Sequence, residues 1–283
     1  MSLKQAELKR KHSLADFTTI KIGGEAKHFF AVSNIESLKK VVKNCQDAFY
    51  ILGGGSNLLV DDNCIEKCVI KLGDEFSYIK QDKYLEVGGS TPLSKVIRYA
   101  SVNNLGGFDN LAGIPATIGG LVAMNASSYG REISAYLRGV EVMDSRGNII
   151  NFKKEEIVFS YRRSSLTECI ILRVWFEAVK DYDTKAKINN FLKTRMSKQD
   201  FEFPNCGCIF KNPETRPAGF LIEACGLKGL KKNDAQVSLK HANFIINLNK
   251  ASYNDVDYLI SHIKENVHKK FDIILEEEIK RWA

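Results

Sequence analysis

The chain has 283 residues, of which 44% are apolar and 27% charged, so its composition is that of a globular protein. Two or three folding units, each with its own core, are expected at this length. The absence of a run of about 18 apolar residues excludes a membrane-spanning helix, and the charged N-terminal segment lacks the apolar stretch of a secretory signal. We therefore expect a cytoplasmic protein without a membrane partner.

Charge and cysteine content narrow the classes of ligand. The net charge of +7 is dispersed along the chain, so small phosphorylated ligands explain it at least as well as nucleic acid does. The seven cysteines are an odd number in a chain too long to need disulfide bonds. The close pairs Cys64/Cys68 and Cys206/Cys208 lack the spacing usual for zinc ligands. We expect reduced thiols and no metal site.

Apolar periodicity predicts an α+β chain. The first third alternates short apolar runs with glycine-rich turns and contains one helical pattern, and a strand-turn-helix unit follows, capped by Ser90 or Thr91. A hairpin and a further strand come next. The predicted strands are 29–32, 49–52, 57–60, 68–72, 84–90 and 169–179, the hairpin is 140–152, and the helices are 35–44, 92–104, 183–199 and 256–271.

The polar helix 183–199 is the predicted domain boundary. It divides the chain into an N-terminal domain, 1–182, with two subdomains split near 73–83, and a C-terminal domain, 183–283. The last segment, DIILEEEIKRW, is predicted to be a strand. Alternation along it places Phe271, Ile273, Leu275 and Ile279 on one face, and Ile274, Glu276, Glu278 and Lys280 on the other.

The loop ILGGGSNLLV is the first chemical signal. It has neither a G-x-G-x-x-G that opens a helix nor the Gly-Lys-Ser/Thr of a P-loop, and the LLV that follows it predicts a strand. Any phosphate would therefore be held by backbone N–H groups, with Ser56 and Asn57 adding side-chain donors. A plain glycine-rich hairpin turn would have the same sequence.

A second glycine-rich segment, 106–130, is dense in small residues and almost free of charge. Small residues allow close backbone contact with a flat ligand such as an isoalloxazine ring and its pyrophosphate. A buried helix packed closely on a sheet would have a similar sequence, so the segment alone leaves both interpretations open.

Eight motifs in order along nearly the whole chain carry a resemblance to a known family. They are TTIKIGG, GGGSN, AGIPATIGGLVAMNAS, YRRS, GCIFKNP, AGFLIEACGLKG, AQVSLKHANFIIN and LEEEIK, and they span residues 18 to 280. In this respect the chain resembles the UDP-N-acetylenolpyruvoylglucosamine reductases (MurB family) of the shorter, type II class. One motif can arise by chance, whereas eight in order indicate kinship.

The resemblance implies a fold, a cofactor and a reaction. The expected fold is a vanillyl-alcohol-oxidase/PCMH-like FAD-binding domain with a C-terminal α+β substrate-binding domain. The expected reaction is NADPH-dependent reduction of UDP-N-acetylglucosamine enolpyruvate to UDP-N-acetylmuramate by a monomer that holds FAD non-covalently. The implied FAD contacts are Gly53, Gly54, Gly55, Ser56, Asn57, Gly113, Ile114, Pro115, Thr117, Gly119, Gly120, Ala123, Asn125 and Ala126.

Three residues match catalytic positions of the family. Arg162 matches the arginine that stabilises carboxylate and enolate charge, and Glu278 matches the catalytic glutamate. Cys208 stands where well-known members have the serine that protonates the intermediate; a thiol, with an ordinary pKa of about 8.5, is a stronger acid than an alcohol. Without the resemblance, a surface salt bridge, a solvated edge and a small apolar residue would explain these positions.

Substrate binding is expected from Lys211, Asn212, Gln236 and Lys280, with Lys240 as a further candidate. Lys280 stands where other members have arginine, so a two-pronged contact is reduced to a point charge. Two alternatives remain: another FAD-dependent sugar or lactone oxidoreductase of the same fold, and a non-catalytic basic module that binds nucleotides or RNA. The scarcity of clustered basic residues argues against the module.

Overall fold

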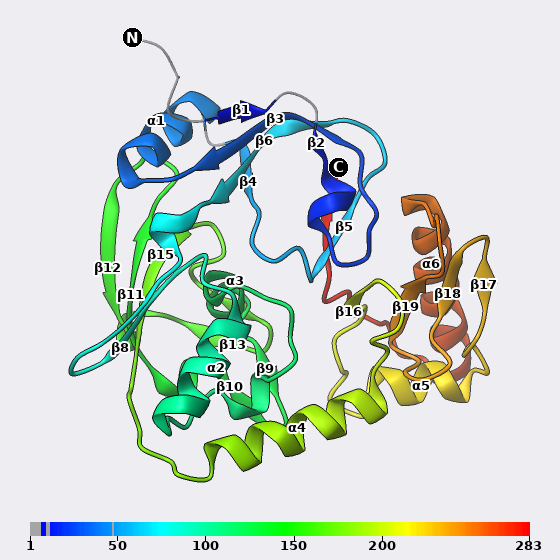
Figure 1. The fold of residues 1–283 in the computed structure, drawn as a ribbon. Coiled ribbons are helices and arrows are strands. Elements are labelled where there is room, and N and C mark those ends of the chain that lie inside the picture. The colour runs from blue at the N-terminus through cyan, green and yellow to red at the C-terminus, as the bar shows by residue number, and fades with distance from the viewer. Residues whose placement is uncertain (1–6, 10–11, 47) are drawn as a thin grey trace. The chain divides into compact units, whose positions relative to one another are not determined.

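The computed structural model describes residues 7–9, 12–46 and 48–283, and the chain forms two compact units (Figure 1). Unit 1 holds the described residues of 1–10, 28–54 and 67–194. Unit 2 holds those of 11–27, 55–66 and 195–283. The units are therefore interleaved along the chain, whereas the expected domains, 1–182 and 183–283, are contiguous. Part of the N-terminal segment discussed above lies outside the described residues.

The first sheet of unit 1 has the strand order β1-β3-β6-β4, with β4 parallel to β6. Its helix, α1, begins where the Asn34 side chain accepts a hydrogen bond from the Ser37 backbone N–H, and it buries Leu38, Val41 and Val42 at helical spacing. The elements are β1 (Glu7–Lys9), β3 (Glu25–Val32), α1 (Ile35–Cys45), β4 (Phe49–Ile51) and β6 (Ile65–Leu72).

The second sheet of unit 1 is antiparallel, with the order β12-β11-β15-β8-β7. Both of its faces are covered. Alternate residues of β15 pack against α2 and α3 on one face, as Ile171 does, and into the core around α1 on the other, as Ile170 does. The elements are β7 (Ile79–Gln81), β8 (Leu85–Gly88), α2 (Leu93–Asn103), α3 (Ile118–Ala123), β11 (Leu137–Met143), β12 (Ile149–Lys153) and β15 (Ile170–Phe176).

The predicted cap of α2 is wrong. The N-cap residue is Pro92, which makes no side-chain cap. The hydroxyl groups of Ser90 and Thr91 donate instead to the carbonyls of Gly73 and Tyr78, because both residues lie in the turn after β8 and are recruited to neighbouring chain segments.

Two short hairpins and one helix complete unit 1. The hairpins are β9 (Ser127–Ser128) with β10 (Arg131–Glu132), and β13 (Phe159–Ser160) with β14 (Arg163–Ser164). Helix α4 (Thr184–Lys198) contains the division between the units. Single turns of 3-10 helix lie in unit 1 at η2 (Asp74–Phe76), η3 (Asp109–Leu111), η4 (Ile133–Tyr136) and η5 (Lys154–Glu156), and in unit 2 at η1 (Leu14–Phe17).

Unit 2 is built on an antiparallel sheet with the order β16-β19-β18-β17, whose core is closed by α5 and α6. Helix α6 buries Val256, Leu259, Ile263 and Val267 at helical spacing, and Ser252 caps it. The elements are β2 (His12–Ser13), β5 (Leu58–Val60), β16 (Asn205–Cys208), α5 (Ala218–Ala224), β17 (Lys231–Lys232), β18 (Ala235–Val237), β19 (Phe244–Asn247), α6 (Tyr253–Phe271) and β20 (Lys280–Trp282).

The predicted last strand is shorter than expected. Helix α6 extends to Phe271, and regular strand structure is confined to β20, which pairs in parallel with β5. The residues before β20 form no regular strand, and Glu277 makes one isolated bridge with Phe210, which follows β16. The expected apolar face holds in part, because Leu275 and Ile279 are buried. Among the described residues, none of the helices is long and apolar enough to span a membrane.

Candidate active site

The glycine loop joins β4 to β5, as predicted, and its first half lies in unit 1 against the second glycine-rich segment. A Cβ added to Gly53 would lie 2.8 Å from Thr117 Oγ1, and one added to Gly54 would lie 2.8 Å from the Pro115 carbonyl oxygen. At Gly54 only glycine permits this close approach of the two backbones, and at Gly53 the Thr117 hydroxyl occupies the place of a Cβ. The structure thus brings together two of the segments predicted to hold the cofactor.

The second half of the loop lies in unit 2. Gly55 has φ +65°, and a Cβ there would lie 1.9 Å from the Phe17 carbonyl oxygen. Asn57 donates through Nδ2 to the Glu278 carbonyl at 3.1 Å and accepts at its own carbonyl from the Lys280 N–H at 2.9 Å. The loop is thereby tied to the C-terminal segment that carries the predicted glutamate.

The segment 113–127 combines a buried side with an exposed backbone. Within it, α3 packs closely on the second sheet, because the Gly119 N–H donates to the Gly89 carbonyl at 2.8 Å. Ile118, Leu121 and Val122 are buried, and Ile114, Ala123 and Ala126 pack against the same core. Gly113, Pro115 and Gly120 are exposed. The helix packed closely on a sheet is confirmed, and the exposed backbone beside it leaves the predicted contact with a flat ligand open.

Asn125, one of the expected FAD contacts, makes a hydrogen bond that fixes a neighbouring hairpin. It is fully buried, and its Nδ2 donates to the Ser160 carbonyl at 3.1 Å. Ser160 is the last residue of β13, so this bond holds the hairpin that carries Arg162.

Lys71 is a cation that sequence reasoning missed. It lies on β6, its Nζ donates to the Gly53 carbonyl at 3.4 Å, and burial lowers its pKa. A lysine below a glycine loop complements a bound phosphate. The alternation of the predicted strand contained no signal for it, because its contact with the loop is tertiary.

Arg162 lies at the tip of the β13–β14 hairpin with φ +59°. Its Nη1 donates to the Ser127 carbonyl at 2.9 Å and to Ser127 Oγ at 2.8 Å. The neighbouring Arg163 is exposed. Of the two adjacent arginines, it is the predicted one, Arg162, that is held in a defined position.

Cys206 and Cys208 lie in different surroundings. Cys206 is in the core of unit 2, and burial raises the pKa of its thiol to about 12. Cys208 is partly exposed and borders a cavity. Alternation along a regular strand would place both thiols on one face. Three residue steps on β16 oppose two on β19, however, and this bulge at Gly207, φ +79°, interrupts the alternation.

The cavity has a volume of about 260 Å³ and lies within unit 2. Cys208 and Asn212, two predicted site residues, border it together with Lys240. The other lining residues are Pro217, Gly219, Phe220, Glu223, His241, Ala242 and Asn243. Asn212 also accepts the Ala218 N–H at 3.0 Å, which fixes the start of α5.

His241 and Asn243 belong to the motif AQVSLKHANFIIN, but no role was predicted for either. His241 Nδ1 accepts the Asn243 N–H at 3.2 Å, so the proton of the neutral ring is on Nε2. Burial lowers its pKa and favours this neutral form. The buried Asn243 side chain pairs with both backbone groups of Phe210, at 3.0 and 2.8 Å, and so fixes the chain that follows Cys208.

The three consecutive glutamates have three environments. Glu276 is exposed and forms an ion pair with Lys211. Glu277 is enclosed by Lys264 and Arg281. Glu278 is partly exposed, and its backbone N–H donates to the Ile209 carbonyl at 2.8 Å, which aligns it beside the chain leaving Cys208.

The remaining predicted substrate contacts are dispersed over unit 2. Gln236 is buried on β18, with its Nε2 bonded to the Gly229 carbonyl at 3.1 Å, and it does not border the cavity described above. Lys280 is exposed at the start of β20, and Lys240 Nζ donates to the Met196 carbonyl at 2.6 Å.

The class of protein is defined by a match to a family model. Residues 26–153 match the family model of an FAD binding domain. Together with the two glycine-rich segments in contact, this match makes the chain a flavoprotein of the PCMH-like α+β fold, as predicted. FAD is therefore its cofactor.

The particular family follows from the rest of the chain. Residues 199–282 match the C-terminal domain of UDP-N-acetylenolpyruvoylglucosamine reductase. Reductases of that name from Clostridium novyi and Desulforamulus reducens are 36% and 37% identical to this chain over 98% and 99% of its length, and the match covers 93% of each relative. The Thermus caldophilus MurB crystal structure matches with a TM-score of 0.87 and 34% identity, covering 98% of this chain and 100% of that one. The chain belongs to the UDP-N-acetylenolpyruvoylglucosamine reductase family.

The residues present fit FAD. In unit 1, Gly54 meets the backbone of 115–116 and Gly53 meets the Thr117 hydroxyl, both at distances that exclude a Cβ. The adjoining surface, at Gly54, Gly113 and Gly120, is exposed backbone, and the Lys71 amine contacts the loop at the Gly53 carbonyl. Such a surface accommodates a flat ring system and a pyrophosphate at close range.

Proposed function

We infer that this chain catalyses the NADPH-dependent reduction of UDP-N-acetylglucosamine enolpyruvate to UDP-N-acetylmuramate, a step of peptidoglycan precursor synthesis. The observation that carries this inference is the identity of 36% to 37% with named reductases across nearly the whole chain, including both the FAD-binding and the C-terminal segments. A binding module without catalysis would not need this combination, and no observation favours an oxidase.

The bound FAD supplies the chemistry of hydride transfer, from NADPH to the enolpyruvyl group. The FAD contacts that we propose from unit 1 are Gly53, Gly54 and the exposed backbone of 113–120. Those from unit 2 are Gly55, Ser56 and Asn57.

We propose that Cys208 holds the proton that completes the reduction. Its Sγ–H would donate to the carbon that bears the ether oxygen, and Glu278, aligned beside the same stretch of chain, would orient the acid or return its proton. Partial exposure at the border of a cavity suits this role, since a proton donor must reach its substrate.

We propose that Arg162 stabilises negative charge on the enolpyruvyl carboxylate and on the enolate that hydride transfer creates. A guanidinium held in a defined plane provides such stabilisation without reorganising during the reaction. The ordered Nη1 contacts with Ser127 support this role.

The substrate contacts that we propose are Lys211, Asn212, Gln236, Lys240 and Lys280. Asn212 and Lys240 have the strongest support because they border the cavity with Cys208. We further propose a cytoplasmic monomer, which light scattering of the purified protein and fractionation of cells would test.

The experiment that tests the function is product analysis in deuterated water. The enzyme, NADPH and the enolpyruvyl substrate should give UDP-N-acetylmuramate with a solvent deuterium on the carbon bearing the ether oxygen. The methyl group receives the hydride, and it carries deuterium to the extent that this hydrogen exchanges with solvent on the flavin. No product with any NADPH-reduced preparation would overturn the proposed function. Turnover only of a free sugar with oxygen as acceptor would establish the oxidase alternative.

A further inference from the structure

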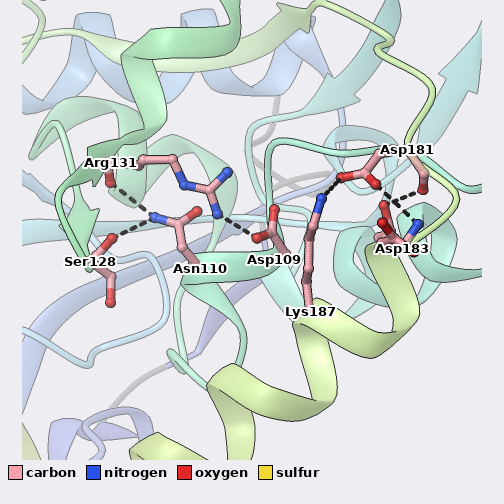
Figure 2. A network of polar contacts seen from close by, with 8 residues as sticks. Asp109, Asn110, Ser128, Arg131, Asp181, Asp183 and Lys187 are labelled. Carbon is pink, nitrogen blue, oxygen red and sulfur yellow. Dashed lines mark hydrogen bonds and ion pairs between the residues drawn. The ribbon is translucent and has the colours of Figure 1, made fainter.

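The hairpin that carries Ser127 is fixed by a buried polar cluster in unit 1 (Figure 2). Asn110 is 2% exposed, and its Nδ2 donates to the Ser128 carbonyl at 2.7 Å and to the Arg131 carbonyl at 3.0 Å. These two carbonyls flank the turn of the hairpin. One amide therefore clamps both ends of the turn.

An ion pair reinforces the clamp. The Asp109 carboxylate is 1% exposed and pairs with the guanidinium of Arg131. The Arg131 side chain is partly exposed, but displacement of the hairpin would leave the buried Asp109 carboxylate without its cation, and a buried unpaired charge is costly. Tyr129 at the tip packs on Phe191 of α4, with ring centroids 4.8 Å apart.

The opposite end of the hairpin meets the proposed catalytic arginine. Ser127 presents both its carbonyl oxygen and its hydroxyl to the same atom, Nη1 of Arg162. Because a guanidinium is planar, two acceptors on one nitrogen restrict the orientation of the whole group. Arg162 itself lies at a hairpin tip with φ +59°, a left-handed conformation that a residue other than glycine keeps only where surrounding contacts hold it.

We propose that Ser127 is a positioning residue for Arg162, and that the Asn110 and Asp109–Arg131 cluster fixes Ser127 for this purpose. Of the two acceptors on Ser127, only the hydroxyl is lost on substitution, because every residue has a backbone carbonyl. This inference rests on the proposed role of Arg162. It assigns Ser127 to the orientation of the arginine, and not to the flavin contacts of the neighbouring segment.

The test separates the two half-reactions by anaerobic rapid-mixing absorbance. Arg162 acts on the enolpyruvyl group, so Ser127→Ala should slow reoxidation of the flavin by substrate roughly tenfold, the size expected when one hydrogen bond to a charged group is lost. Reduction by NADPH should be unchanged. Ser127→Thr, which keeps the hydroxyl, should restore reoxidation. Ser160→Ala is the matched control, since that exposed serine lies in the Arg162 hairpin.

A double-mutant comparison decides whether Ser127 acts through the arginine. In an Arg162→Lys background, Ser127→Ala should produce no further loss. Equal losses in both half-reactions, or losses that multiply in the double variant, would overturn the positioning role while leaving the proposed function intact. Normal reoxidation in Arg162→Lys alone would instead remove Arg162 from the proposed mechanism, and the positioning role with it.

Discussion

At the scale of single residues, burial separates two thiols that the sequence places two positions apart. Cys206 is packed into the core of unit 2 with a raised pKa, whereas Cys208 borders the cavity. A proton donor needs access to its substrate, so only Cys208 suits the proposed reaction.

Replacement of these thiols should therefore have opposite consequences. Cys208→Ala should slow flavin reoxidation by the enolpyruvyl substrate roughly 100-fold or more, the usual contribution of a general acid, whereas Cys208→Ser should stay active. Cys206→Ala should lower thermal stability through a small cavity and leave reoxidation unchanged. Stopped-flow absorbance and thermal unfolding measure the two effects. Near-normal reoxidation in Cys208→Ala would contradict the assignment.

His241 predicts a pH dependence of stability. Its folded-state pKa is lowered by burial, so the unfolded chain takes up a proton more readily, and stability is lost as pH falls through the ordinary histidine pKa of about 6.5. His241→Asn retains an acceptor for the Asn243 N–H but cannot titrate. The fall in melting temperature between about pH 7.5 and pH 5 should be smaller in this variant than in the wild type. An identical fall in both proteins would refute the prediction.

At the scale of elements, the consecutive glutamates of the C-terminal segment differ in their contacts and in their expected roles. Glu277 joins α6 to β20 through Lys264 and Arg281. Although burial disfavours its charged form, hydrogen bonds from Arg281 and Lys264 lower its pKa. Its stabilising contribution is therefore present above the ordinary glutamate pKa and lost as pH falls below it.

Replacing Glu277 or Glu278 singly by glutamine should distinguish a structural role from a catalytic one. Glu277→Gln should lower the free energy of unfolding by about 1–3 kcal/mol near neutral pH and leave both half-reactions unchanged, because the partly buried Lys264 and Arg281 lose their anionic partner. Glu278→Gln should preserve stability and slow reoxidation by substrate. Denaturant titration and stopped-flow absorbance distinguish them. An active Glu278→Gln variant would remove this residue from the proposed mechanism.

The glycine loop depends on a backbone conformation that places Gly55 against the Phe17 carbonyl. Gly55→Ala places a methyl group where the Phe17 carbonyl lies, so it should reduce both stability and FAD retention. Gly226, with φ +75° and no neighbour within 4 Å of an added Cβ, is the matched control for backbone conformation alone. Gly226→Ala should cost about 1 kcal/mol and retain FAD. Equal behaviour of the two variants in melting and in FAD content would contradict this account.

At the scale of the whole molecule, local patterns identified most elements. Helix α1, the 137–153 hairpin strands and α6 follow from apolar spacing, and the ordered motifs identified the family. Interleaving of the two units, which places 11–27 and 55–66 with the C-terminal residues, has no local signal because tertiary packing decides it. The same is true of Lys71 and Ser127, whose partners lie 18 and 35 positions away. The predicted α2 cap was wrong because the hydroxyl groups of Ser90 and Thr91 donate to neighbouring segments, and the last strand is short because only 280–282 pair with another strand.

The central claim is that FAD in this protein passes reducing equivalents from NADPH to an enolpyruvyl sugar nucleotide. The most direct measurement is the visible spectrum of the purified protein under anaerobic conditions. NADPH should bleach the flavin bands, and addition of UDP-N-acetylglucosamine enolpyruvate should restore them without oxygen. Bands that return only when oxygen is admitted, or a protein that binds no FAD even after incubation with it, would contradict the account.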